Sequence, residues 1–202
     1  MALDKSVMSS GFELIFNPES SPGSESECAS LMTDVIMAYL GPVQISPPVA
    51  PGVGPLPPAP SPGPDPAFVP SNGTPVTPVD ANRSIIQDGL EGAMSQNKDS
   101  ASKTGWTIAD LAFASYVTST FSAWSEPSGY TFAGACTPGA INFFSIMSSE
   151  SDDFADICSK LADHIHTFFT TSIYTGTYTR VMPPPATVGP FVGAVPHVTP
   201  LM

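Results

Sequence analysis

Proline dominates the stretch from Pro42 to Pro78, which holds more than half of the 24 prolines in this chain of 202 residues. Each proline fixes φ and removes a backbone donor, so a packed helix or a central strand cannot form there. The composition alone fits a disordered linker, but the stretch is too apolar for a typical solvated spacer. We therefore expect an extended arm that docks on a neighbouring chain. Its apolar residues are Val43, Ile45, Val49, Val53, Leu56, Phe68 and Val69.

The segment from Ser151 to Val195 predicts a helix, an extended strand and a second proline-rich piece. Ser151 is placed to cap the helix, and Asp152 and Asp153 follow in the first turn, where the helix dipole favours negative charge. The Thr- and Tyr-rich run from Ile173 to Arg180 predicts a strand or hairpin. The helix itself is indicated by a wide apolar stripe at helical spacing, made of Phe154, Ile157, Cys158, Leu161, Ile165, Phe168 and Phe169.

A similar unit stands near the start of the chain. Ser24 and Glu27 form a capping box for a helix that ends at Gly41-Pro42. Prolines follow both helices, and the helices align at Cys28-x-x-Leu31 and Cys158-x-x-Leu161. Any two amphipathic helices align in this way, so the shared prolines are the stronger part of the comparison. We interpret the chain as a repeated unit of helix and extended arm.

The middle of the chain predicts two more helices. Ala81 to Ser95 has one apolar side, and Thr107 to Ala123 is apolar nearly all round, which is typical of a central helix. Thr107 with Asp110 matches a capping box. Two other apolar runs, Phe12–Phe16 and Ala140–Met147, are too short for their period to separate a strand from a helical turn. Tyr130–Phe132 is a candidate short strand.

These elements predict a mainly α fold with minor β. We expect a small bundle of about four helices, built from the repeated unit and carrying proline-rich extended segments. The chain divides into an N-terminal helical unit (1–41), a proline-rich extended arm (42–80), a central helical core (81–147), and a C-terminal unit of helix, Thr-rich strand and proline-braced tail (148–202).

The charge of the chain argues against two classes of partner. The net charge is −12 and only six residues are Lys or Arg, so neither nucleic acid nor an anionic membrane surface is an expected partner. No apolar stretch is long enough to span a bilayer, and Met1–Asn17 does not match a signal peptide. Charged residues make up 12% of the chain, and Gly189–Met202 is apolar and uncharged. A surface of this kind is expected to be covered by partners.

No catalytic signature is found. His164-x-His166 is the one paired-imidazole signal, but it lies in a helical pattern, so the two rings are expected to point apart. A zinc site would need further ligands at organised spacing. Cys28 and Cys158 lie on apolar stripes and are expected to be buried, reduced thiols. We predict no catalytic residue, no metal site and no cofactor.

The chain resembles small virion proteins of tailed bacteriophages, T4-like myophages among them. Like them it is acidic, poor in Lys and rich in Ala, Ser and Thr. The matching residues are Ala162–Phe169, Thr170–Arg180 and Pro183–Gly193, with a similar middle stretch from Gly89 to Phe121. The resemblance implies a structural role in a capsid, neck, tail or baseplate.

We therefore expect a non-enzymatic structural subunit of a virion, assembled in the host cytoplasm with other virion proteins and as a homo-oligomer or symmetric assembly. Two alternatives are a proline-rich partner-binding module that presents Pro57-Pro58-Ala59-Pro60, and a metal-dependent hydrolase that uses His164 and His166. In the structural role, Pro42–Pro78 and Gly189–Met202 should lie mostly on other chains. The expected interface residues are Val49, Val53, Phe68, Pro184, Pro185, Phe191 and Val195.

Overall fold

A computed structural model describes residues 3–17, 19, 22–45, 53–54, 63–64, 72–97, 103–125, 130–148, 153–180 and 197–201. For residues 53–54, 63–64, 130–133, 176–180 and 197–200 it describes the backbone alone.

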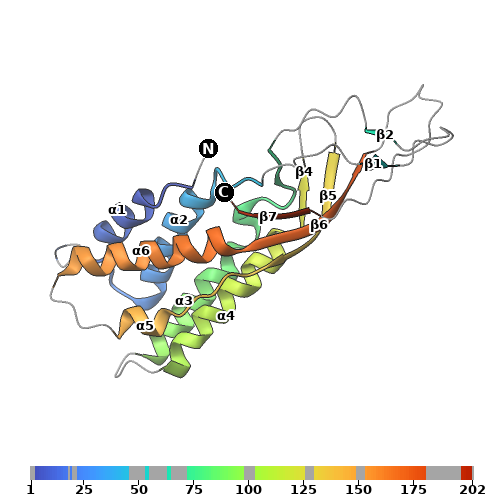
Figure 1. The fold of residues 1–202 in the computed structure, drawn as a ribbon. Coiled ribbons are helices and arrows are strands. Elements are labelled where there is room, and N and C mark those ends of the chain that lie inside the picture. Colours follow the sequence, from blue (N-terminus) through green and yellow to red (C-terminus); the bar gives the residue numbers. More distant parts are fainter. Residues whose placement is uncertain are drawn as a thin grey trace.

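The described part of the chain is mainly helical with small strands, as the sequence predicts (Figure 1). The α-helices are α1 (Ser6–Ile15), α2 (Glu25–Leu40), α3 (Arg83–Gln96), α4 (Lys103–Thr120), α5 (Phe143–Met147) and α6 (Phe154–Thr171), with a 3-10 turn, η1, at Val79–Asn82. The strands are β1 (Val53–Gly54), β2 (Gly63–Pro64), β3 (Thr74–Pro75), β4 (Ala123–Ser125), β5 (Tyr130–Thr137), β6 (Ile173–Arg180) and β7 (His197–Pro200).

The helices pack around an aromatic core. α2 lies between α1 and α3, α4 packs on α3 and α5, and α6 packs on α1. The Phe113 ring of α4 contacts Phe143 of α5 and Phe168 and Phe169 of α6, with ring centroids 5.0, 5.8 and 6.2 Å away. All four side chains are fully buried. This cluster joins three helices, and aromatic pairs of this kind stabilise a core beyond their buried area.

The caps of α2 and α6 fix where these helices begin. Ser24 is the N-cap of α2, and its Oγ accepts a hydrogen bond from the Glu27 amide at 3.1 Å. The Glu27 carboxylate accepts from the Gly23 amide, one residue earlier than a capping box requires. The N-cap of α6 is Asp153, which accepts from the Ala155 amide at 3.0 Å. The prediction that Asp153 sits inside the first turn behind a Ser151 cap is therefore wrong.

The helix α4 begins one turn earlier than its sequence suggests. It starts at Lys103, and the Thr107 hydroxyl donates to the Lys103 carbonyl at 2.9 Å inside the helix. Asp110 accepts a hydrogen bond from the Phe143 amide at 2.9 Å, so it holds the start of α5 and does not close a capping box. The predicted cap at Thr107 is wrong, and the helix ends at Thr120 because the chain turns into β4 three residues later.

A five-stranded antiparallel sheet has the order β3-β4-β5-β6-β7, and β1 pairs separately with β2. The predicted strand from Ile173 to Arg180 is confirmed as β6. β5 is longer than the three residues expected and pairs with all of β6, from Tyr130 opposite Arg180 to Thr137 opposite Ile173. The two undecided apolar runs, near Phe12 and near Phe144, are both helical.

Parts of the two segments that were expected to lie on other chains pair with this chain's own strands. Ile45 bridges both Gly73 and Leu201, and Ile45 and Leu201 are 0% and 1% exposed. β7 pairs with β6 of the same chain, with His197 opposite Gly176 and Pro200 opposite Ile173. The prediction for the tail is therefore wrong for residues 197–201, because an antiparallel ladder and a buried leucine tie them to their own sheet.

Candidate functional site

The predicted interface residues fall mostly outside the described residues. Val49, Phe68, Pro184, Pro185, Phe191 and Val195 lie there. Val53 stands in β1 opposite Pro64 of β2, where the backbone is described. The sites that can be built from the structure are therefore the histidine contacts, the surface grooves and the sheet.

His164 fastens α5 to α6. Its Nε2 accepts a hydrogen bond from the Asn142 amide at 2.8 Å. The next amide, that of Phe143, donates to the Asp110 carboxylate. Burial lowers the pKa of His164 below its ordinary value of 6.5, and the negative charge of Asp110 acts in the opposite direction. Burial likewise raises the pKa of Asp110, while its hydrogen bond from Phe143 opposes this. Both acceptors are used to hold the N-terminus of a short helix, which is a structural role.

His166 lies against a different neighbour, as the helical spacing predicts. Its Nδ1 is 2.8 Å from the hydroxyl oxygen of Tyr39 in α2, and the two rings meet edge to face. Of the third histidine, His197, the structure describes the backbone in β7. Among the described residues no group of three or more His, Cys, Asp or Glu side chains is placed to hold a metal ion. The geometry therefore gives the hydrolase alternative no support.

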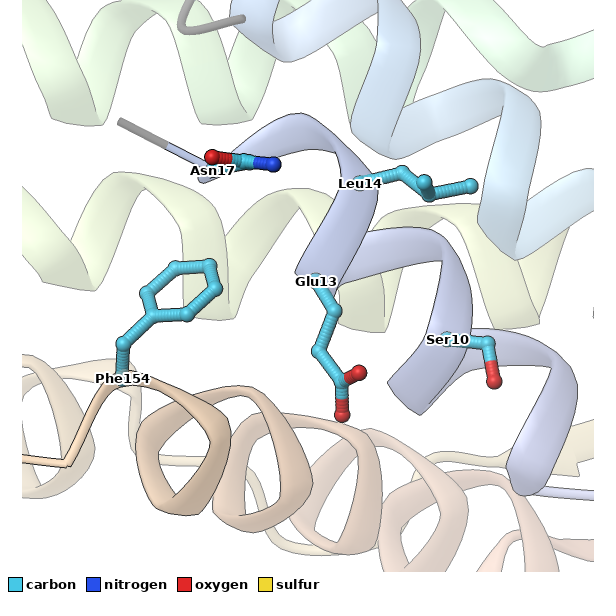
Figure 2. Close-up of a pocket in the computed structure, with 5 residues that line it drawn as sticks. All are labelled: Ser10, Glu13, Leu14, Asn17 and Phe154. Carbon is cyan, nitrogen blue, oxygen red and sulfur yellow. The ribbon is translucent and has the colours of Figure 1, made fainter. Parts of the chain in front are cut away.

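An open groove lies between α1 and the start of α6, and we call it the α1–α6 groove (Figure 2). It has a volume of about 550 Å³ and is lined by Ser10, Glu13, Leu14, Asn17 and Phe154. Figure 2 shows Glu13 reaching from α1 toward α6 and the Phe154 ring standing at the start of α6. The lining offers one carboxylate, one hydroxyl, one amide and two apolar side chains. An open groove with this lining suits contact with a partner side chain.

A second groove, of about 440 Å³, lies over α6 beside α5 and has Lys160, Asp163 and His164 in its lining. Its charged groups are already paired within the chain. Lys160 pairs with Asp156 one turn earlier, and Asp163 pairs with Lys5 at the start of α1. These polar groups join elements of the fold, and they are not poised to receive a ligand.

The three cysteines are buried and unpaired. Cys28, Cys136 and Cys158 are 9%, 2% and 0% exposed, and all are free thiols. The predicted burial of Cys28 and Cys158 is confirmed. Burial raises the pKa of Cys136 to about 12, and burial together with the nearby Glu13 charge raises the pKa of Cys158 to about 11. Thiols with such values carry almost no thiolate at neutral pH and are weak nucleophiles.

The pairing of β5 with β6 forms a long two-stranded element, here called the β5–β6 ribbon. Figure 1 shows α6 leading directly into β6 and the ribbon running away from the helices. β7 covers the outer side of β6 from Ile173 to Gly176 only. Within the described part of the chain, no strand pairs with that side of β6 from Thr177 to Arg180. Backbone groups on such an edge are a template for pairing with another strand.

The hydrogen bonds between β6 and β7 show which side the backbone amides and carbonyls of β6 face. The Ser172 carbonyl accepts a hydrogen bond from the Leu201 amide, so residue 172 faces the β7 side. The amide and carbonyl of one strand residue point to the same side, and the side alternates along the strand. The backbone groups of Tyr178 and Arg180 therefore face the β7 side, where no described strand pairs with them, while those of Thr177 and Thr179 face β5. Sequence reasoning missed this edge because it is set by the register with β7.

Comparison with models of known protein families, with curated proteins and with solved structures finds no match for this chain. Within the described residues, none of the helices has both the length and the apolar character needed to cross a membrane.

Proposed function

We propose that this protein is a non-enzymatic structural subunit of a virus particle, most like the capsid, neck, tail or baseplate proteins of tailed phages. The observation that carries the proposal is the edge of β6 from Thr177 to Arg180, with which no strand among the described residues pairs, at the end of a ribbon that extends away from the helices. In the proposal, the helices form a bundle that serves as the body, and the ribbon and the proline-rich segments serve as arms.

The ribbon joins subunits by strand addition. A strand of a neighbouring subunit pairs with Tyr178 and Arg180 on the side of β6 where β7 lies, in line with β7. Main-chain hydrogen bonds supply the affinity, and they require little charge on either partner. Symmetric repetition turns individually weak contacts into a tight assembly. The low charged content of 12% supports a surface that partners cover.

The sequence resemblance to virion proteins supports the choice of particle. Part of the matching sequence, Ala162–Arg180, comprises the second half of α6 and all of β6. The use of polar groups within the described residues supports a structural role as well. Both described histidine side chains, the Asp110 carboxylate and the Tyr39 hydroxyl are engaged in contacts between elements of the fold. The proline-rich partner-binding alternative lies outside the described residues and gains nothing from them.

The test of location uses the virus that encodes this sequence. Particles purified through a density gradient are analysed by quantitative mass spectrometry for peptides of this chain. We expect an integer number of copies for each symmetric ring or shell, retained after washing in high salt. If the chain is absent from washed particles, the proposed function is wrong.

The test of mechanism compares two substitutions at one edge residue. Tyr178→Pro removes the outward amide of β6, whereas Tyr178→Val removes the same side chain and keeps that amide. We expect the proline variant to be lost from particles and the valine variant to be retained. Both variants must first give the helical circular dichroism of the original protein. Equal incorporation of the two folded variants would show that the edge does not join subunits.

A further inference from the structure

The sheet closes on itself at one level through a single residue, Ile45. The strand order β3-β4-β5-β6-β7 ends in β7, and Leu201, directly after β7, forms an antiparallel bridge with Ile45. Ile45 forms a second antiparallel bridge with Gly73, the residue directly before β3. Paired neighbours therefore run from β3 to β7 and, through Ile45, back to the start of β3. At the level of Ile45 the sheet is a closed ring.

The two sides of Ile45 are used differently. On one side its amide donates to the Gly73 carbonyl at 3.1 Å, and the Gly73 amide donates back to the Ile45 carbonyl at 3.0 Å. The amide and carbonyl of a strand residue point to the same side, so Leu201 lies on the other side of Ile45. The Leu201 amide in turn donates to the Ser172 carbonyl. Ile45 and Leu201 are therefore a non-hydrogen-bonded pair, the type whose side chains lie closer together.

The side chains at this closure are buried and closely packed. Ile45 is 0% exposed and Leu201 is 1% exposed. A Cβ added at Gly73 would lie 3.2 Å from Cγ1 of Ile45 and 3.6 Å from the Ser125 carbonyl oxygen of β4. Loss of the Leu201 side chain would uncover apolar surface of Ile45, which is unfavourable in water. Ile45 is thus held in the sheet by hydrogen bonds on one side and by apolar contact on the other.

Ile45 also stands at the base of the proline-rich stretch. The chain leaves the sheet after Ile45 and returns at Gly73, which is its bridge partner. The Asn72 side chain donates a hydrogen bond to Oε1 of Gln44 at 2.7 Å beside this bridge. The returning end is fixed to the sheet because β3 pairs with β4. The outgoing end is fixed by the two bridges of Ile45, and one of these is to the C-terminal tail.

We propose that Ile45 and Leu201 form a latch that couples the C-terminal tail to the base of the proline-rich stretch. When Leu201 leaves the sheet, Ile45 loses one of its two described strand partners, and its hydrogen bonds to Gly73 open more often. Coupling of this kind is reciprocal, so a partner that draws Ile45 out of the sheet also loosens the tail. A partner bound to one segment thereby changes how firmly the other is held. The inference goes beyond the proposed function and does not depend on it.

The first experiment measures amide hydrogen exchange in the full chain by NMR. Leu201→Asp puts a charge at a buried position, so the tail should leave the sheet. The amides of Ile45 and Gly73 should then exchange at least about tenfold faster relative to the amide of Val117 in α4, because their local opening has become easier. The variant must first give the helical circular dichroism of the original protein.

The matched control is Ile86→Ala, which truncates a fully buried side chain of α3. It lowers the stability of the whole protein, so it should not single out Ile45 and Gly73. Unchanged relative exchange at these two amides in folded Leu201→Asp, or the same rise in the control, overturns the latch. If Leu201→Asp does not fold, the second experiment decides.

The second experiment closes and opens the latch in one molecule. The Cα atoms of a non-hydrogen-bonded antiparallel pair are about 4.5 Å apart, which a disulfide can span. The double variant Ile45→Cys with Leu201→Cys should therefore form a disulfide within one chain on mild oxidation. The native thiols are buried, so they do not compete. The control pair, Gly73→Cys with Leu201→Cys, has its thiols on opposite sides of Ile45 and should not cross-link.

The readout is the amide of Gly73 in the Ile45→Cys, Leu201→Cys variant. It should exchange at least about tenfold more slowly in the oxidised form than in the reduced form, again relative to Val117. Comparing two forms of one variant removes any loss of stability that the substitutions cause. Equal exchange in both forms would show that the tail does not hold the base of the proline-rich stretch. Failure to form the disulfide would show that Ile45 and Leu201 are not paired, and the inference would fall.

These outcomes are separate from those of the proposed function. Exchange and cross-linking are measured on the isolated protein, and presence in washed particles is measured by mass spectrometry. A protein found in particles whose Gly73 amide ignores the disulfide keeps the proposed function and loses the latch. A protein that shows the coupling and is absent from particles keeps the latch and loses the proposed function.

Discussion

The hydroxyl oxygen of Tyr39 lies 2.8 Å from Nδ1 of His166, and this hydrogen bond joins α2 to α6 across 127 residues of sequence. The Tyr39 side chain is 1% exposed, and its ring also packs on Phe169. Burial raises the pKa of Tyr39, so its hydroxyl keeps its proton at neutral pH. The contact ties together the two helices that the sequence alone marks as a repeated unit.

Replacing Tyr39 by Phe should test this contact with little change in packing. The ring stays in the core while the hydroxyl is lost, so the free energy of unfolding should fall by about 1 kcal/mol, the usual net value of one hydrogen bond. Urea unfolding followed by circular dichroism measures it. His166→Ala alone and the double variant complete the cycle. If the losses of the single variants simply add, the hydrogen bond contributes nothing to stability.

The bond between His164 and the Asn142 amide predicts a dependence of stability on pH. The pKa of His164 is lowered in the folded protein by burial, so below its ordinary value of 6.5 the unfolded chain binds a proton that the folded chain resists. The stabilising contribution is complete above that value and is lost as the pH falls through the lower, folded pKa. Protonation also removes the acceptor that Asn142 uses.

The measurement compares the original protein with His164→Asn, which cannot titrate. Unfolding free energies are collected between about pH 8 and about pH 5, the range in which histidine changes charge. The carboxylates are common to both proteins, so their titration cancels in the difference. That difference should shrink toward the acid end, because only the original protein loses stability when His164 is protonated. A difference that stays constant over this range would contradict the assignment of Nε2 as an acceptor.

Sequence patterns were sufficient where a helix has one apolar side. α2, α3 and α6 lie within a few residues of their predicted positions because an apolar stripe is a local signal. The start of α4 was missed because Thr107 and Asp110 imitate a capping box. Its extra turn is held by tertiary contacts: Trp106 stacks on Phe143, and a side chain on Gly105 would meet the Asn97 side chain at 2.4 Å.

β6 was predicted from the sequence, but the rest of the sheet and its pairing could not be, for a different reason. β5 contains Ala133, Gly134 and Ala135, which have low strand propensity, and its partner β6 begins more than thirty residues later. The outer strands β3 and β7 are shorter than the window that shows a period of two. The β6 edge depends on the register of β6 with β7, which long-range packing sets.

The buried cysteines predict that the folded protein is unreactive toward thiol reagents. With pKa values raised to about 12 for Cys136 and about 11 for Cys158, and with Cys28 also raised by burial, almost no thiolate is present at neutral pH. A chromogenic disulfide reagent should detect no rapid thiol in the native protein. All three should react at once in concentrated urea. One thiol that reacts rapidly without denaturant would show that its part of the core opens locally.

The closest approach of α3 to α4 predicts opposite effects at two neighbouring glycines. A Cβ added at Gly89 would lie 2.1 Å from the Cβ of Ala112, whereas one added at Gly92 would lie 3.5 Å from the nearest atom of Ile108, an ordinary contact. Gly89→Ala must push the helices apart and should cost about 1–3 kcal/mol. Gly92→Ala should stabilise the protein by about 0.5–1 kcal/mol, because alanine is the better helix former.

Urea unfolding of the two variants measures the change in the free energy of unfolding. The same methyl group is added in both, so the two values can be compared directly. A third protein, Gly89→Ala with Ala112→Gly, moves the methyl group from α4 to α3 and restores the space between them. It should be more stable than the sum of its two single changes predicts, since the clash is gone and each helix still has one glycine at the crossing. Equal destabilisation by Gly89→Ala and Gly92→Ala, or strict additivity in the exchanged pair, would show that the two helices do not meet at Gly89 and Ala112.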